Sequence, residues 1–150
     1  MAYKINEEVY TIDIENEKGQ ITTVSLDAND IAQVDALFTM FESFDDMKNS
    51  IDKRVKKLEK EYDNERVVMR QTLRVMTEEL DKFYKSLDNL FFEGLSNEVF
   101  GNKKSVIAVM NFVDMLENEF VPAIDKAQKA QERKFKEWDE KYTQKDDDLL

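Results

Sequence analysis

The stretch from Leu73 to Ile124, LRVMTEELDKFYKSLDNLFFEGLSNEVFGNKKSVIAVMNFVDMLENEFVPAI, decides the fold. Apolar residues recur in it every three or four positions, which is the spacing of one face of an α-helix. A segment with two glycines, Gly94 and Gly101, interrupts this pattern, and a second amphipathic run then continues to Pro122. The pattern predicts two helices joined by an apolar elbow over residues 92–104, that is, a helical hairpin. The elbow and its flanks supply the first candidate protein-binding residues: Leu87, Leu90, Phe91, Leu95, Val99, Phe100 and Phe112.

Residues 1–28 predict a β-hairpin. Val9–Ile14 and Ile21–Leu26 are rich in β-branched residues, and the turn between them ends with Gly19. A two-stranded hairpin is marginally stable alone, so we expect it to pack on the helices or to pair with a strand of another chain. Packing on the chain's own helices is the favoured alternative.

Residues 29–143 predict a bundle of long amphipathic helices with coiled-coil character. No glycine or proline occurs between residues 28 and 93, so one helix of about 60 residues, roughly 90 Å long, is possible. A fold-back at the polar residues 63–65 is the alternative, and we favour it because a small domain has difficulty covering so long a helix. We expect a last helix from Pro122 and a frayed acidic tail over residues 144–150. The fold class is therefore mainly α, with an N-terminal β-hairpin.

Two further groups of residues are candidate protein-binding positions. Arg66, Arg70 and Arg74 are four residues apart and so share one helix face. Pairing with glutamates of an adjacent helix is the favoured explanation, and binding of phosphate or of a partner's acidic side chains is the other. Phe135, Trp138 and Tyr142 form an aromatic stripe that either completes the protein's own bundle or docks into a partner.

The composition argues against reaction chemistry. The chain of 150 residues has no Cys and no His, which removes thiolate chemistry, imidazole proton transfer and nearly all zinc or copper sites. No glycine-rich phosphate loop and no nucleophile motif is present. We therefore expect no enzyme activity, no catalytic residue, no cofactor and no metal.

The charge is acidic but uneven along the chain. The net charge is −11 overall, and residues 48–74 carry nine basic against five acidic side chains. Acidic proteins are poor nucleic-acid binders, so we expect no nucleic-acid partner. No apolar run of about 18 residues is present, so we expect no membrane span, and the N-terminus lacks the apolar core of a signal peptide.

The stretch from Met69 to about Lys126 resembles a family of small tail assembly chaperones from phages and prophages of Gram-positive bacteria. The resemblance rests on Leu87-Asp88-Asn89-Leu90-Phe91, Glu93-Gly94, Val99-Phe100-Gly101, Asn111-Phe112 and Val121-Pro122, and on the opening Tyr3-Lys4-Ile5-Asn6. Family members usually have a glycine where this chain has Phe92.

This resemblance implies a protein that self-associates into a spiral and coats the tape measure protein before handing over to the tail tube protein. It also implies a location in the cytoplasm of the bacterial host and absence from the mature virion. Two other interpretations remain open. One is a coiled-coil adaptor that dimerises through its helices, and the other is an acidic anti-host protein that mimics DNA.

Overall fold

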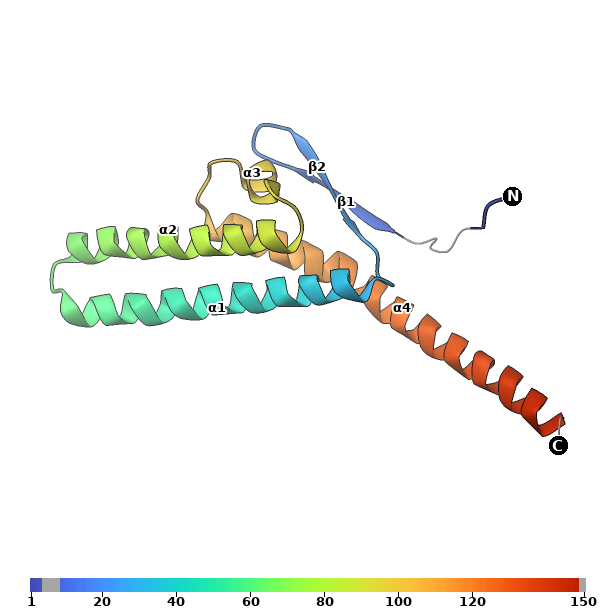
Figure 1. Ribbon diagram of the computed structural model, residues 1–150. Helices are drawn as coiled ribbons and strands as arrows, with labels where there is room; N and C mark the ends of the chain where they lie inside the picture. The colour runs from blue at the N-terminus through green and yellow to red at the C-terminus, as the bar shows by residue number, and fades with distance from the viewer. Residues whose placement is uncertain (4–8, 149–150) are drawn as a thin grey trace.

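A computed structural model describes residues 1–3 and 9–148, and the side chains of residues 1–3 and 9–143. The elements in chain order are β1 (Tyr10–Glu15), β2 (Ile21–Leu26), α1 (Ile31–Glu61), α2 (Glu65–Leu90), α3 (Leu95–Phe100) and α4 (Val106–Asp148). Figure 1 shows a β-hairpin set against one end of a group of long helices. The protein is thus mainly α with an N-terminal two-stranded antiparallel hairpin, which confirms the predicted fold class. Lys4, Ile5 and Asn6 of the family-like opening lie outside the described residues.

The β-hairpin packs on the chain's own helices, as favoured from the sequence. Tyr10 pairs with Leu26 at one end of the ladder and Glu15 with Ile21 at the other. Val24 and Leu26 on one face of β2 are buried in the same core as the helices. The turn residue Asn16 extends this contact, because its side-chain amide donates a hydrogen bond of 3.1 Å to the carbonyl of Glu98 at the end of α3.

The chain folds back between α1 and α2 at residues 62–64, so these residues do not form one long helix. The side chain of Asn64 accepts hydrogen bonds from the backbone N–H groups of Arg66 and Val67, which satisfies two donors that the first turn of α2 would leave unpaired. α1 and α2 lie side by side and antiparallel along their length (Figure 1). This pair is the helical hairpin of the structure.

The elbow connects the helices on either side of it in a different way from the one predicted. The prediction of a hairpin between the helices on either side of it is wrong, because α3 and its two loops carry the chain back and α4 then runs in the same direction as α2 (Figure 1). Gly94 and Gly101 provide the two positive φ angles, 91° and 61°, that these reversals require. Phe92 has no positive φ, so the glycine usual at this position in the resembling family is not needed here.

Asp88 and Ser105 anchor the segment between α2 and α4. Asp88 accepts hydrogen bonds from both the backbone N–H and the hydroxyl of Ser96, which secures the start of α3 to the last turns of α2. Ser105 caps α4 by accepting from the N–H of Ala108.

α4 differs from expectation at two places. The last helix does not begin at Pro122, because Pro122 lies inside a helix that begins at Val106. The tail is not frayed from residue 144, since the helix continues to Asp148. A proline in a helix interior costs one backbone hydrogen bond but does not always end the helix when packing holds both sides, and Phe120 and Ile124 are both buried.

The stability of the core depends on the aromatic contacts at the elbow. Phe100 is buried, stacks on Tyr84 at 5.0 Å between ring centroids and meets Phe112 edge to face at 5.4 Å. We expect Phe100→Ala to lower the free energy of unfolding by about 3 kcal/mol or more, because a large buried side chain is removed. Urea denaturation followed by circular dichroism measures the change. The control is Phe92→Ala, whose side chain is 42% exposed and whose loss should cost less than about 1 kcal/mol. Equal losses from the two variants would contradict this assignment of the core.

Candidate protein-binding surfaces

The seven elbow residues come together in space, but mostly inside the molecule. Leu87, Leu95, Val99, Phe100 and Phe112 are buried members of one hydrophobic core. Leu90 and Phe91 are half-buried at the edge of that core. Five of the seven candidate residues therefore stabilise the fold and are not available to a partner in this conformation.

Leu90 and Phe91 line an apolar hollow of about 500 Å³ between β2, the first turns of α1 and the end of α2. Ala32, Ala36 and Phe92 are among its other lining residues. On the neighbouring part of α1, Ile31 and Phe38 are exposed apolar side chains one heptad apart. This hollow is the part of the predicted elbow surface that a partner's apolar side chains can reach.

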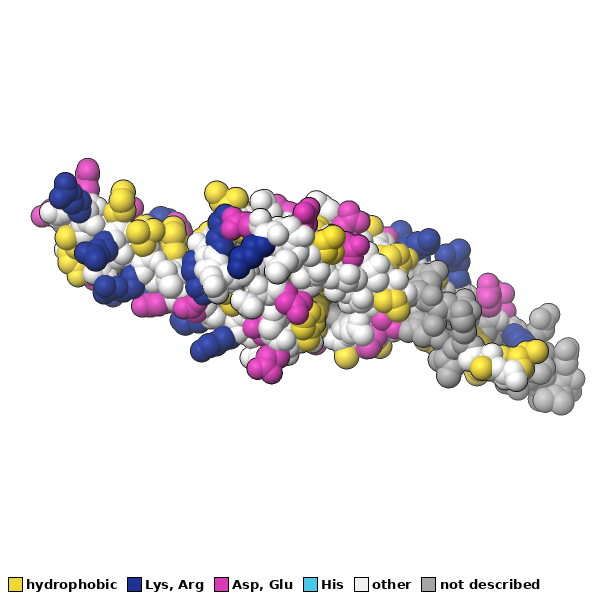
Figure 2. Space-filling model, turned by 90° about the horizontal axis from the view of Figure 1, so that it is seen from above, with side chains coloured by type: hydrophobic (Ala, Val, Ile, Leu, Met, Phe, Trp, Pro, Cys, Tyr) yellow, Lys and Arg dark blue, Asp and Glu magenta, His cyan; other side chains and the backbone are white. Residues whose placement is uncertain are grey.

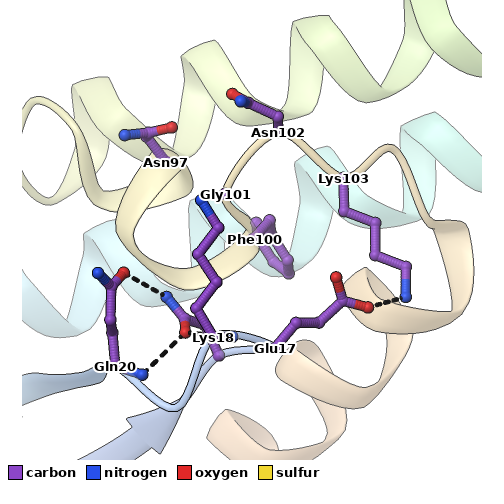
Figure 3. A pocket seen from close by; sticks show the side chains of 9 residues that line it. Glu17, Lys18, Gln20, Asn97, Phe100, Gly101, Asn102 and Lys103 are labelled. Carbon is purple, nitrogen blue, oxygen red and sulfur yellow. Dashed lines mark hydrogen bonds and ion pairs between the residues drawn. The ribbon is translucent and has the colours of Figure 1, made fainter.

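A second hollow lies between the hairpin turn and the elbow (Figure 3). Its lining is largely polar and includes Glu17, Gln20, Asn97 and Asn102, with Phe100 at its base. An ion pair between Glu17 and Lys103 connects its two sides. These contacts attach the hairpin to the elbow, and this hollow contains none of the apolar surface predicted for partner binding except the ring of Phe100.

The arginine row lies on the exposed face of the first half of α2. Pairing of Arg66, Arg70 and Arg74 with glutamates of an adjacent helix was favoured from the sequence, and this is wrong. Among the residues that the structure describes, none of the three forms an ion pair. The glutamates of α2 pair with α1 through a different residue, Arg54. The row is therefore free to meet acidic groups from outside.

The aromatic stripe of α4 is exposed as well. Phe135 and Trp138 are 71% and 62% exposed, and Trp138 and Tyr142 contact each other with ring centroids 4.1 Å apart. The stripe does not complete the bundle of its own chain, because among the described side chains of α4 none beyond Ala127 is buried. An apolar hollow beside Phe135 and Trp138 includes the stems of Gln131 and Lys134.

Sequence reasoning missed a third exposed apolar surface. Met69 and Leu73 are 68% and 60% exposed, although their heptad spacing marks them as core positions. The spacing is genuine, since Leu80 and Leu87 follow Leu73 at seven-residue intervals and are buried. The exposed positions differ from the buried ones only in lying before the point at which α4 begins to cover α2. The sequence does not show where that point is.

Charged groups hold α1 and α2 together near the middle of their length. The carboxylate of Glu79 is buried and accepts hydrogen bonds from Arg54 Nη1 at 2.8 Å and from Ser50 Oγ at 2.9 Å. Burial by itself would raise the pKa of Glu79, but the hydrogen bonds from Arg54 and Ser50 and the nearby charge of Lys82 hold the pKa below its ordinary value. This buried pair links the two helices at a fixed register.

At the start of α4, Tyr84 is held by a related set of contacts. Its hydroxyl donates a hydrogen bond of 2.9 Å to the carbonyl of Lys103, and burial raises the pKa of the phenol. Lys104 pairs with Asp81 and lies over the Tyr84 ring. These groups position the beginning of α4 on α2.

The structure defines a mainly α protein with exposed apolar side chains on its helices. Residues 21–147 match the model of a family of unknown function (DUF6673), and the chain belongs to this family. No curated protein and no solved structure matches the chain. Within the described part of the chain, no helix combines the length and apolar character needed to cross a membrane.

The buried Glu79 predicts an acid dependence of stability. Because the pKa of Glu79 is lower in the folded than in the unfolded state, its contribution is present above the unfolded pKa and is lost as pH falls through the folded value. We expect the melting temperature of the native protein to fall more steeply below about pH 4.5 than that of Glu79→Gln, which lacks the titrating group. The control is Glu78→Gln, because Glu78 pairs with the same arginine but its side chain is half exposed and its ion pair is screened. Parallel curves for the native protein and Glu79→Gln would contradict the prediction.

Proposed function

We propose that this protein is a tail assembly chaperone of a phage or prophage of Gram-positive bacteria. In this role it self-associates and coats the tape measure protein until the tail tube protein replaces it. It acts in the cytoplasm of the bacterial host and is not retained in the mature virion. The resemblance of residues 69–126 to such chaperones supports the proposal, as does the placement of apolar helix faces where the chain's own core leaves them uncovered.

The observation that carries the proposal is the exposure of apolar side chains at separate places on the molecule. Leu73 on α2, Phe92 beside the hollow at the end of α2, and Trp138 on α4 are all exposed. A protein that must contact both further copies of itself and a long helical partner needs several such surfaces. We assign the hollow beside Leu90 and Phe91 to the tape measure protein, because an amphipathic helix binds by placing its apolar face in such a groove.

A coiled-coil adaptor is the second candidate function. It is favoured by one observation, the aromatic stripe on the exposed face of α4, because such a stripe can pair with its equivalent in a second chain. An adaptor of this kind would form a discrete dimer, and it would not require the hollow beside Leu90 and Phe91.

Binding to the tape measure protein can be tested by co-expression. We expect the tape measure protein of the phage or prophage that encodes this chain to remain soluble and to co-purify with the native chain, and to precipitate without it. Phe92→Asp should reduce the co-purified amount at least tenfold, because a charge then faces the apolar hollow. Ile107→Asp is the matched control, since Ile107 is 70% exposed and lies on α4, outside the hollow. Undiminished co-purification with Phe92→Asp would contradict the assigned surface, and absence of any complex with the native chain would contradict the chaperone.

Self-association should also depend on the arginine row. We expect the triple change of Arg66, Arg70 and Arg74 to Glu to weaken self-association at least tenfold, as measured by sedimentation velocity over a range of concentrations. Helix content by circular dichroism should stay unchanged, because the three side chains are exposed and none of them forms an ion pair among the described residues. Loss of helix content in this variant would show that the row supports the fold.

A further inference from the structure

The two-helix pair of α1 and α2 lacks cover over its distal part. α4 begins where Lys104 pairs with Asp81, so it covers α2 only from about that residue onwards (Figure 1). Along one line of α2 the exposed fraction falls from 60% at Leu73 to 1% at Leu80. We call residues 51–61 of α1 and 65–80 of α2 the overhang. Among the described residues, no third helix packs beside the overhang as α4 packs beside the rest of α1 and α2. Figure 2 shows hydrophobic side chains interspersed with Lys and Arg at the end of the molecule that carries the α1–α2 turn.

At the other end of the molecule, the C-terminal part of α4 extends beyond the body (Figure 1). We call residues 132–148 of α4 the extension, which projects from the body in Figure 1. Just before the extension, Gln131 Nε2 donates a hydrogen bond of 3.1 Å to Asn29 Oδ1 and so attaches α4 to the body. Beyond it the seam of α4 continues in steps of three and four, since Phe120, Ile124 and Ala127 are buried and Phe135, Trp138 and Tyr142 follow in register but are exposed. The face that packs on α1 and α2 inside the chain is therefore also the face that the extension presents.

The two features match in length and in charge. At 1.5 Å per residue the extension is roughly 25 Å long and the α2 part of the overhang is roughly 24 Å long. The overhang has eight basic against six acidic side chains, whereas the extension has seven acidic against five basic, so the two carry opposite net charge. Because Arg66, Arg70 and Arg74 form no ion pair among the described residues, the overhang has basic groups beside its apolar face for an acidic helix to meet.

We infer that the extension of one copy docks on the overhang of the next copy and completes its three-helix bundle there. Docked parallel to α2, as α4 is within its own chain, the extension places Trp138 and Tyr142 over Met69 and Leu73. Donor and acceptor are different surfaces, so each copy can bind one neighbour at each end, and the contact generates an open filament. This inference rests on the self-association in the proposed function and specifies its interface.

Two face-specific variants test this contact, because each blocks a different half of it. Leu73→Asp damages the acceptor and keeps the donor, and Trp138→Asp does the reverse. Both side chains are more than half exposed, so neither change should unfold the protein, and circular dichroism checks this. By light scattering after size exclusion we expect concentration-dependent oligomers for the native chain and monomers for each variant alone. An equimolar mixture of the two variants should give a heterodimer and nothing larger, since only one productive pair of surfaces remains.

Matched controls place the same charge away from the apolar lines of the same helices, about 120° around α2 from Leu73 and about 160° around α4 from Trp138. Val67→Asp on α2 and Lys136→Asp on α4 should self-associate like the native chain, because neither position lies on the apolar line. A mixture of Leu73→Asp and Trp138→Asp that stays monomeric would overturn the inference. The inference would also be overturned if the Leu73→Asp variant still formed dimers through the aromatic stripe, which is the result expected for a coiled-coil adaptor. No tape measure protein is present in this experiment, so its outcome is independent of whether the chain binds that partner.

Discussion

The contacts at Tyr84 determine where α4 starts along α2. Its ring stacks on Phe100, its hydroxyl binds the carbonyl of Lys103, and Lys104 beside it pairs with Asp81. Together they hold the loop before α4 near the middle of α2 and not at its end. Because α4 is a single helix from that point, its position decides which parts of the molecule are covered. The core from Leu80 to Leu87 is complete, the first half of α2 is left uncovered, and the last third of α4 extends past the body.

Much of the fold could be predicted from the sequence, because periodicity and turn residues are local signals. The β-hairpin with its turn at Gly19 and the amphipathic helices follow from such signals, whereas the fold-back at residues 63–65 was favoured because a small domain has difficulty covering one long helix. The direction of α4 does not. Two glycines and a six-residue helix are compatible with a simple hairpin or with a return crossing, and the choice depends on long-range contacts such as the one between Tyr84 and Phe100. Pro122 was misleading for a related reason, since buried residues on both sides keep the helix continuous.

The candidate binding surfaces show the same difference between what local sequence signals predict and what long-range packing decides. The sequence indicates that Phe100, Leu73 and Trp138 lie on apolar helix faces, but it does not distinguish a face that is covered from one that is free. Phe100 is in the core, whereas Leu73 and Trp138 are exposed. The arginine row shows the converse. The sequence favoured glutamates of an adjacent helix as partners of the row, but the described ion pairs between α1 and α2 join Arg54 on α1 to Glu78 and Glu79 on α2, the helix of the row itself.

Pro122 has a consequence for the direction of the extension. With no N–H at this position, the carbonyl of Asn118 lacks its helical donor, and a helix with one missing bond bends there at lower cost. Pro122 precedes the point at which α4 leaves the body. Because Phe120 and Ile124 on either side are buried, packing fixes any bend at Pro122, and that bend sets the direction in which the extension leaves the body.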